Sequence, residues 1–263
     1  MKVAVLASGL LRGEWRKNLE NFKTFFGDVD LFTAGWDRED LKQEDREFVD
    51  HTFEEPEVLY HPVQDTEPYP TGKCKGYKDN RILHDKTQHA HKQIMIHDYL
   101  LNAVDPDCNY DLIIRARFDC WLSRKVDFRP WMERSLADNC AIGFGCRPGR
   151  HKNLDVFAEL PHYYPPKPNE KDHPDYGQSE KTRYELAKTQ DWAYNLMDPL
   201  IFHPRKLWDT ELVNRLFNEK QLKCAEWGWY QVLSEPYGES HLCVYGGAQI
   251  ERHVGREKLN NPS

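Results

Sequence analysis

The chain has 263 residues, of which 39% are hydrophobic and 30% charged, and its formal net charge is −7. This composition is typical of a globular protein with a substantial core and excludes a disordered chain. The negative charge argues against binding to bulk nucleic acid or to an anionic membrane surface, so an anionic ligand would need a local cluster of Arg and Lys.

No apolar run in the sequence approaches the length that crosses a membrane. The run at the N-terminus, VAVLA, lacks the length and the small-residue cleavage site of a signal peptide, so we expect a buried first strand there. The seven cysteines are an odd number, and no two of them have the short spacing of a zinc site. We therefore expect reduced thiols in a cytoplasmic protein.

The first half of the chain predicts strands alternating with helices. Residues 2–8 form a continuous apolar run, typical of a strand covered on both faces. Residues 28–37 predict a second strand, and residues 56–63 a third, short one. Between the first two strands, apolar residues recur at intervals of three and four, which predicts a helix; they are Trp15, Leu19, Phe22, Phe25 and Phe26. Strand, helix and strand in this order favour a right-handed parallel crossover.

The later elements continue this pattern. A helix is predicted over residues 84–104, strands over 110–117 and 140–146, helices over 211–217 and 226–233, and a last strand after residue 240. Residues 147–190 hold six of the sixteen prolines, which predicts a long mobile loop. We expect an α/β fold with a mostly parallel, Rossmann-type sheet flanked by helices. We expect one domain with two halves, residues 1–146 and 147–263.

The stretch YDLIIRARFDCWLS begins as a buried strand and ends in charged residues. Arg115, Arg117 and Asp119 occupy alternate positions, so they share one face of the strand. In open α/β sheets, ligands bind at the carboxyl ends of strands. There, a carboxylate can hold Mg²⁺ or Mn²⁺, and guanidinium groups match the oxygens of a diphosphate. The alternative is an internal ion pair, with Arg115 or Arg117 on Asp119.

Three residues that follow the first strand are further candidates for nucleotide binding. Ser8 and Gly9 end the strand, and glycine lets a backbone approach a ligand closely. Arg12 follows and has the length to reach a phosphate. The alternative is an ordinary tight turn.

Three polar residues elsewhere in the first half could face the same ligand. Asp37 ends the second predicted strand, where it would contact a ribose or base, or would instead cap a following helix. Gln88 and Lys92 are one turn apart on the predicted long helix and so share a face. That face would contact the ligand or be solvated.

Four segments together resemble a known family of enzymes. YDLIIRARFD, preceded by KTQHAHKQIMIHDYLL, resembles the R-x-R-x-D region of bacterial and viral polysaccharide-synthesis glycosyltransferases of the WavE-like kind. VAVLASGLLRGEWRKNLENF resembles their opening strand and Arg-containing loop, DVDLFTAGWD their second strand, and AEWGWYQVL their acidic helix start. The likeness follows the chain in order except at about residues 147–190. It implies a GT-A-like fold, with a nucleotide-sugar-binding half (1–146) before an acceptor-binding half (147–263).

The resemblance implies roles for residues of the second half. It makes Glu226, at a predicted helix start, the base that deprotonates an acceptor hydroxyl. The alternative is a first-turn Glu favoured by the helix dipole. Asp191 is a second candidate base, or an N-cap. Trp227 and Trp229 would stack on a sugar or belong to a buried aromatic cluster.

The resemblance also implies a divalent cation, Mn²⁺ or Mg²⁺, held by Asp119 and by His253 near the C-terminus. The sequence departs from the family here, because many GT-A enzymes carry D-x-D where this chain has Arg117, Phe118 and Asp119. A single carboxylate leaves the metal requirement open, since Arg117 could supply part of the positive charge.

The predicted function is the transfer of a sugar from a nucleotide-diphosphate donor to a hydroxyl of a glycan or lipid-linked acceptor. A sugar nucleotidyltransferase is an alternative, although the loop ASGLLRG is poor in glycine for that class. A non-catalytic carbohydrate-binding or degenerate transferase protein is another alternative, which the aromatic residues and the charged loop would suit.

Overall fold

The computed structural model describes residues 1–11, 14–37, 42–56, 80–122, 126–145, 158–159, 196, 198–219, 222, 225–237, 241–245 and 248–250. Of residues 80–91, 158–159, 225–227, 243, 245 and 249–250 it describes the backbone alone.

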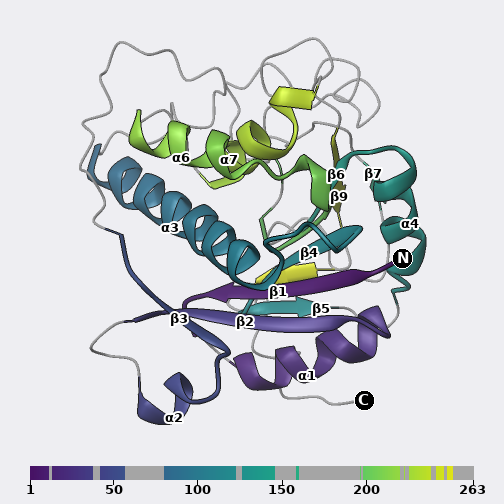
Figure 1. Cartoon of the computed structure of the whole chain (residues 1–263), viewed down its shortest axis with the longest axis horizontal. Helices are drawn as coiled ribbons and strands as arrows, with labels where there is room; N and C mark the ends of the chain where they lie inside the picture. Colours follow the sequence, from purple (N-terminus) through teal and green to yellow (C-terminus); the bar gives the residue numbers. More distant parts are fainter. Residues whose placement is uncertain are drawn as a thin grey trace, which may run out of the picture.

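An eight-stranded sheet organises the described part of the chain (Figure 1). Neighbouring strands pair in parallel except at β8 and β7, which run antiparallel to their neighbours. The predicted α/β fold with a mostly parallel sheet is therefore confirmed. In sheet order the strands are β3 (His51–Glu54), β2 (Asp30–Asp37), β1 (Val3–Gly9), β4 (Leu112–Arg117), β8 (Leu200–Pro204), β6 (Ala141–Gly145), β9 (His241–Tyr245) and β7 (Ala158–Glu159).

Helices cover both faces of this sheet (Figure 1). On one face, α3 (Asn80–Val104) lies along the strands, with α6 (Thr210–Asn218) and α7 (Ala225–Leu233) beside it. The other face carries α1 (Trp15–Phe26) and α4 (Arg129–Ala137). Shorter elements complete the description: α2 (Gln43–Arg46), two 3₁₀ turns (Arg205–Leu207 and Glu235–Tyr237), and a two-stranded antiparallel sheet of β5 (Cys120–Leu122) and β10 (Ala248–Ile250).

The alternation of side chains along the strands produces two cores, one on each face. In β1, Ala4 and Leu6 pack towards α3, whereas Val3, Val5 and Ala7 pack towards α1. All five are buried, which explains why β1 appears in the sequence as an unbroken apolar run.

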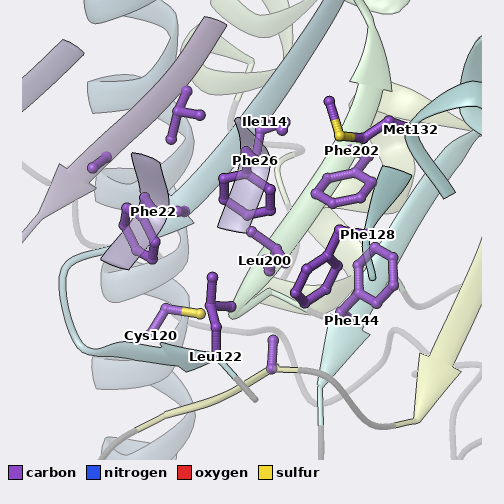
Figure 2. Close-up of a cluster of buried hydrophobic side chains, with 14 of the residues drawn as sticks. Phe22, Phe26, Ile114, Cys120, Leu122, Phe128, Met132, Phe144, Leu200 and Phe202 are labelled. Carbon is purple, nitrogen blue, oxygen red and sulfur yellow. The ribbon is translucent and has the colours of Figure 1, made fainter. Parts of the chain in front are cut away.

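Aromatic rings dominate the core on the α1 face (Figure 2). Phe128, at the start of α4, contacts the rings of Phe26, Phe144 and Phe202 edge-on, with centroids 5.4–5.9 Å apart. These rings come from α1, β6 and β8, so the cluster ties elements of the first half of the chain to β8 in the second half. Since β8 lies between β4 and β6, the two predicted halves share one sheet.

Two elements differ from the predictions. The third strand along the chain is His51–Glu54, which the sequence did not predict and which alternates half-buried and exposed residues. The strand predicted at residues 56–63 stays a prediction. Residues 57–63 lie outside the described ranges. The long helix begins at Asn80, four residues before the predicted start. Of the predicted loop at 147–190, only β7 is described.

Within the described ranges, no helix combines the length and the apolar character needed to cross a membrane.

Asp209 caps α6, and its replacement gives a direct test of this part of the fold. Its Oδ1 accepts hydrogen bonds from the backbone N–H groups of Glu211 (2.9 Å) and Leu212 (3.1 Å). Asp209→Ala leaves both donors without this partner, so we expect the free energy of unfolding to fall by about 1 kcal/mol. Urea unfolding measures the change, with Asp209→Asn as the control because Asn also caps. Equal stability of the Ala and Asn variants would contradict the assignment.

Candidate functional site

The charged end of β4 lies at an edge of the sheet where three strands meet. β1 and β4 run in parallel, so Ser8 stands opposite Arg117 where both strands end. β8 runs antiparallel to β4, and its first residue, Leu200, stands opposite Ala116. The carboxyl edge of β1 and β4 therefore also receives the residues just before β8, which include Asp198.

Arg117 links two carboxylates at this edge. Its Nε and Nη2 donate to the two oxygens of Asp119, at 2.7 and 3.0 Å, and its Nη1 donates to Oδ2 of Asp198 at 3.0 Å. The side chains of Arg117, Asp119 and Asp198, which we call the Arg117 cluster, are 16%, 9% and 12% exposed. Burial opposes the charge on Arg117, but the two carboxylates outweigh it and raise the pKa of the guanidinium.

Asp198 did not feature in the sequence-based site. Its signal was the Asp-Pro step before the apolar run LIFH, which marks the start of a strand. A strand start belongs to the ligand-binding edge only if that strand runs antiparallel to its neighbours, as β8 does.

Arg115 has a different environment from Arg117, although both lie on the same face of β4. Its guanidinium is fully buried, donates to Oε1 of Gln93 (2.8 Å) and to the backbone carbonyl of Asp198, and lies 4.8 Å from the ring centroid of Trp229. Burial lowers the pKa of Arg115 to about 10, against the opposing effect of Asp198. Arg115 thus joins α3, α7 and the segment before β8, and its predicted contact with a diphosphate stays a prediction.

Asp119 forms the internal ion pair that was the alternative interpretation of the motif, with Arg117 as its partner. Both of its oxygens accept hydrogen bonds from Arg117. Within the described ranges, no group of three or more His, Cys, Asp or Glu residues gathers as metal ligands would. Among the described residues, both oxygens of Asp119 are thus held by Arg117 rather than left free for a cation. His253 lies outside them, three residues after Ile250, which pairs with Cys120.

Ser8 and Gly9 present an open position at the end of β1. Ser8 is 2% exposed, and its Oγ has no hydrogen-bond partner among the described residues. Gly9 has φ +120°, which favours glycine, and a Cβ built there would meet no heavy atom within 4 Å. A buried hydroxyl without a partner is uncommon in folded proteins, so this place suits a ligand atom. Arg12 lies outside the described residues.

The remaining donor-site predictions fall on ion pairs or on side chains that are not described. Asp37 pairs with Arg46 of α2, whose N-cap is Lys42, so the interpretation of Asp37 as the cap of that helix is wrong. Lys92 pairs with Glu55 at 2.6 Å, and about a quarter of each side chain is exposed. The side chain of Gln88 is not described.

Of the predicted catalytic residues, Glu226 lies in the first turn of α7, although its side chain is not described, and Asp191 lies outside the described ranges. Trp229 is fully buried and packs near Trp208, with ring centroids 5.9 Å apart. For Trp229, the interpretation as part of a buried aromatic cluster is confirmed. The side chain of Trp227 is not described.

Two buried histidines lie in the same core, and the ring of His97 packs edge-on against Trp229, with centroids 5.4 Å apart. Nε2 of His97, on α3, is 3.3 Å from Nε2 of His203, on β8, and both residues are fully buried. Nδ1 of His203 is 3.0 Å from the carbonyl of Pro204, so it carries the proton and Nε2 accepts one from His97. Nδ1 of His97 is then a bare nitrogen, in keeping with its lack of a partner among the described residues. This arrangement is that of two neutral rings, in keeping with the pKa of each ring, which burial lowers.

Comparison with known proteins gives no match by sequence and a distant likeness by structure. No family model and no curated protein matches the sequence. Among solved structures, the chain resembles the crystal structure of mannose-1-phosphate geranyltransferase from Thermus thermophilus, with a TM-score of 0.38, 13% sequence identity, and coverage of 94% of this chain and 75% of that one. A likeness of this size says nothing about the reaction.

Proposed function

We propose that this chain is a glycosyltransferase that moves a sugar from a nucleotide-diphosphate donor to a hydroxyl of a glycan or lipid-linked acceptor. The observation that carries the proposal is the meeting of Ser8, Gly9 and the Arg117 cluster at the carboxyl edge of β1 and β4. In open α/β sheets this edge is where ligands bind. The resemblance of four segments to polysaccharide-synthesis glycosyltransferases supports the same reaction class.

The chemistry needs a base and a departing diphosphate. The acceptor oxygen forms a bond to the anomeric carbon while the bond from that carbon to the diphosphate oxygen breaks, and the diphosphate leaves with the electron pair. The acceptor proton passes to a carboxylate, which we assign to Glu226, with Asp191 as the alternative. Trp229 of α7 packs on the buried guanidinium of Arg115, which holds the helix against the sheet. This supports a fixed position for the first turn of α7, where Glu226 lies.

A divalent cation is not required by this proposal. The family resemblance implies Mn²⁺ or Mg²⁺, which would neutralise the departing diphosphate. Because Arg117 already pairs with both oxygens of Asp119, the cation is left as a variable to be tested rather than as a step in the reaction.

A thermal-shift panel of UDP-, GDP-, dTDP- and CMP-sugars, each with and without Mn²⁺, tests the proposal. A ligand that binds only the folded state stabilises it by about 2.7 kcal/mol at one hundred times its dissociation constant. We expect one of the diphosphate sugars to raise the melting temperature. No shift with any of them, or a shift with CMP-sugars alone, would contradict the proposal. Binding without turnover would indicate a carbohydrate-binding protein, and release of pyrophosphate a nucleotidyltransferase.

A further inference from the structure

We propose that the Arg117 cluster and Ser8 bind hydroxyl groups of a sugar rather than a diphosphate. The inference rests on the proposed function in that it assigns this edge of the sheet to the sugar of the donor. It differs from the first expectation for the motif, in which the arginines bind phosphate.

The charges at this place sum to zero. Arg115 and Arg117 each contribute +1, and Asp119 and Asp198 each contribute −1. A diphosphate is attracted by an excess of positive charge or of N–H donors, and these four groups provide no excess charge. An uncharged ligand with many hydroxyl groups meets no such obstacle.

The cluster retains hydrogen-bonding capacity of both kinds. A guanidinium has five N–H donors, and Arg117 uses three of them on Asp119 and Asp198, which leaves two. Each carboxylate has about four acceptor positions, of which Arg117 occupies two on Asp119 and one on Asp198. Neighbouring hydroxyl groups of a sugar each donate one hydrogen bond and accept others, so donors and acceptors held side by side match them.

The backbone around the cluster is held from several directions. Arg115 donates to the carbonyl of Asp198, and the backbone N–H of Arg117 donates to the carbonyl of Pro199 at 3.3 Å. On the opposite face of the sheet, the side-chain amide of Asn18 donates to the carbonyl of Phe118 at 2.9 Å. Groups already fixed in place lose little conformational freedom when a ligand binds, which favours selective recognition of hydroxyl positions.

Ser8 adds a buried hydroxyl next to the Arg117 cluster. It stands opposite Arg117 in the pairing of β1 with β4, and both side chains lie on the α3 face. Adjacent strands are about 4.8 Å apart, so the two side chains are neighbours. The Ser8 hydroxyl is buried and has no partner among the described residues, so a ligand hydroxyl would satisfy it.

Two variants test the inference by titration calorimetry with a nucleotide sugar and with its nucleoside diphosphate. Ser8→Ala removes a hydroxyl without a described partner, so we expect unchanged stability and sugar-nucleotide binding weakened by about 3- to 10-fold. Asp198→Asn removes a charged acceptor, so we expect it to weaken sugar-nucleotide binding by about 10- to 100-fold. Binding of the nucleoside diphosphate should stay within about 2-fold in both.

Asp105→Asn is the matched control, because Asp105 pairs with buried Arg205 at 2.9 Å, beyond the other end of β8. It should leave both affinities unchanged. Equal weakening of sugar-nucleotide and diphosphate binding in Ser8→Ala and Asp198→Asn would overturn the inference in favour of a phosphate site, and so would unchanged affinity for both ligands.

Failure of the proposed function has a separate signature. If no nucleotide sugar binds the unmodified protein, the inference is decided by saturation-transfer NMR with free monosaccharides. Signals that disappear in Asp198→Asn but persist in Asp105→Asn would support a hydroxyl-binding site without nucleotide-sugar chemistry. No monosaccharide signal with the unmodified protein would overturn the inference.

Discussion

Glu226→Gln is expected to lower the rate of sugar transfer by roughly 10²–10⁴-fold, the range for removal of a general base, with donor affinity nearly unchanged. The reason is that the amide keeps the shape of the side chain but cannot accept the acceptor proton. If Glu226 acts only on the dipole of α7, the same change costs a few tenths of a kcal/mol to about 1 kcal/mol of stability and leaves the rate unchanged.

Single-turnover rate and donor affinity, measured on the one variant, separate these outcomes. Asp191→Asn is the companion variant because Asp191 is the other candidate base. A near-normal rate in Glu226→Gln with a large loss in Asp191→Asn would transfer the role to Asp191. A product of retained anomeric configuration would remove the need for a base of this kind in either place.

Acidification is expected to destabilise the fold through the His97–His203 pair. Burial lowers the pKa of His97 well below its ordinary value, as do His203, Arg115 and Arg205 nearby. Burial also lowers the pKa of His203 to about 4, although its hydrogen bond to the Pro204 carbonyl opposes this. Below the ordinary value of about 6.5, the unfolded chain binds a proton at each ring while the folded chain does not.

The stability that depends on the neutral rings is therefore complete above about pH 6.5 and is lost as the pH falls towards 4. While a histidine is protonated in the unfolded chain and neutral in the folded one, it contributes about 1.4 kcal/mol per pH unit, so the pair contributes at most about 2.8 kcal/mol per unit. Urea unfolding at pH 7, 6 and 5 measures the slope. Replacing both histidines by Phe should flatten it by up to that amount, and an unchanged slope in the double variant would contradict this account.

The order of the early elements could be predicted because each of them buries its side chains in a regular pattern. β1 is covered on both faces and so is apolar throughout, and α1 buries residues at helical spacing, namely Trp15, Leu19, Phe22 and Phe26. By contrast, α4 buries only Met132 and Ser135 within nine residues, which is too narrow a stripe to give a periodic signal. A short element that is held by tertiary contacts, as α4 is by the contacts of Phe128 with Phe26 and Phe144, gives little periodic signal in the local sequence.

The sequence predicted which face of β4 carries the two arginines, but not how deeply each side chain is buried. Alternation along β4 placed Arg115 and Arg117 on one face, and both lie towards α3. It could not show that α3 and α7 bury Arg115 completely while Arg117 remains at the edge. Asp198 was missed because its place depends on the antiparallel direction of β8, which is a property of sheet topology and not of local sequence.

Phosphorus NMR of the protein incubated with the best-binding nucleotide sugar tests the central claim most directly. The account predicts that the sugar-nucleotide resonances are replaced by those of a nucleoside diphosphate, slowly with water and faster when a glycan acceptor is added. Unchanged resonances over many hours, or pyrophosphate produced from a sugar phosphate and a nucleoside triphosphate in a parallel sample, would contradict it.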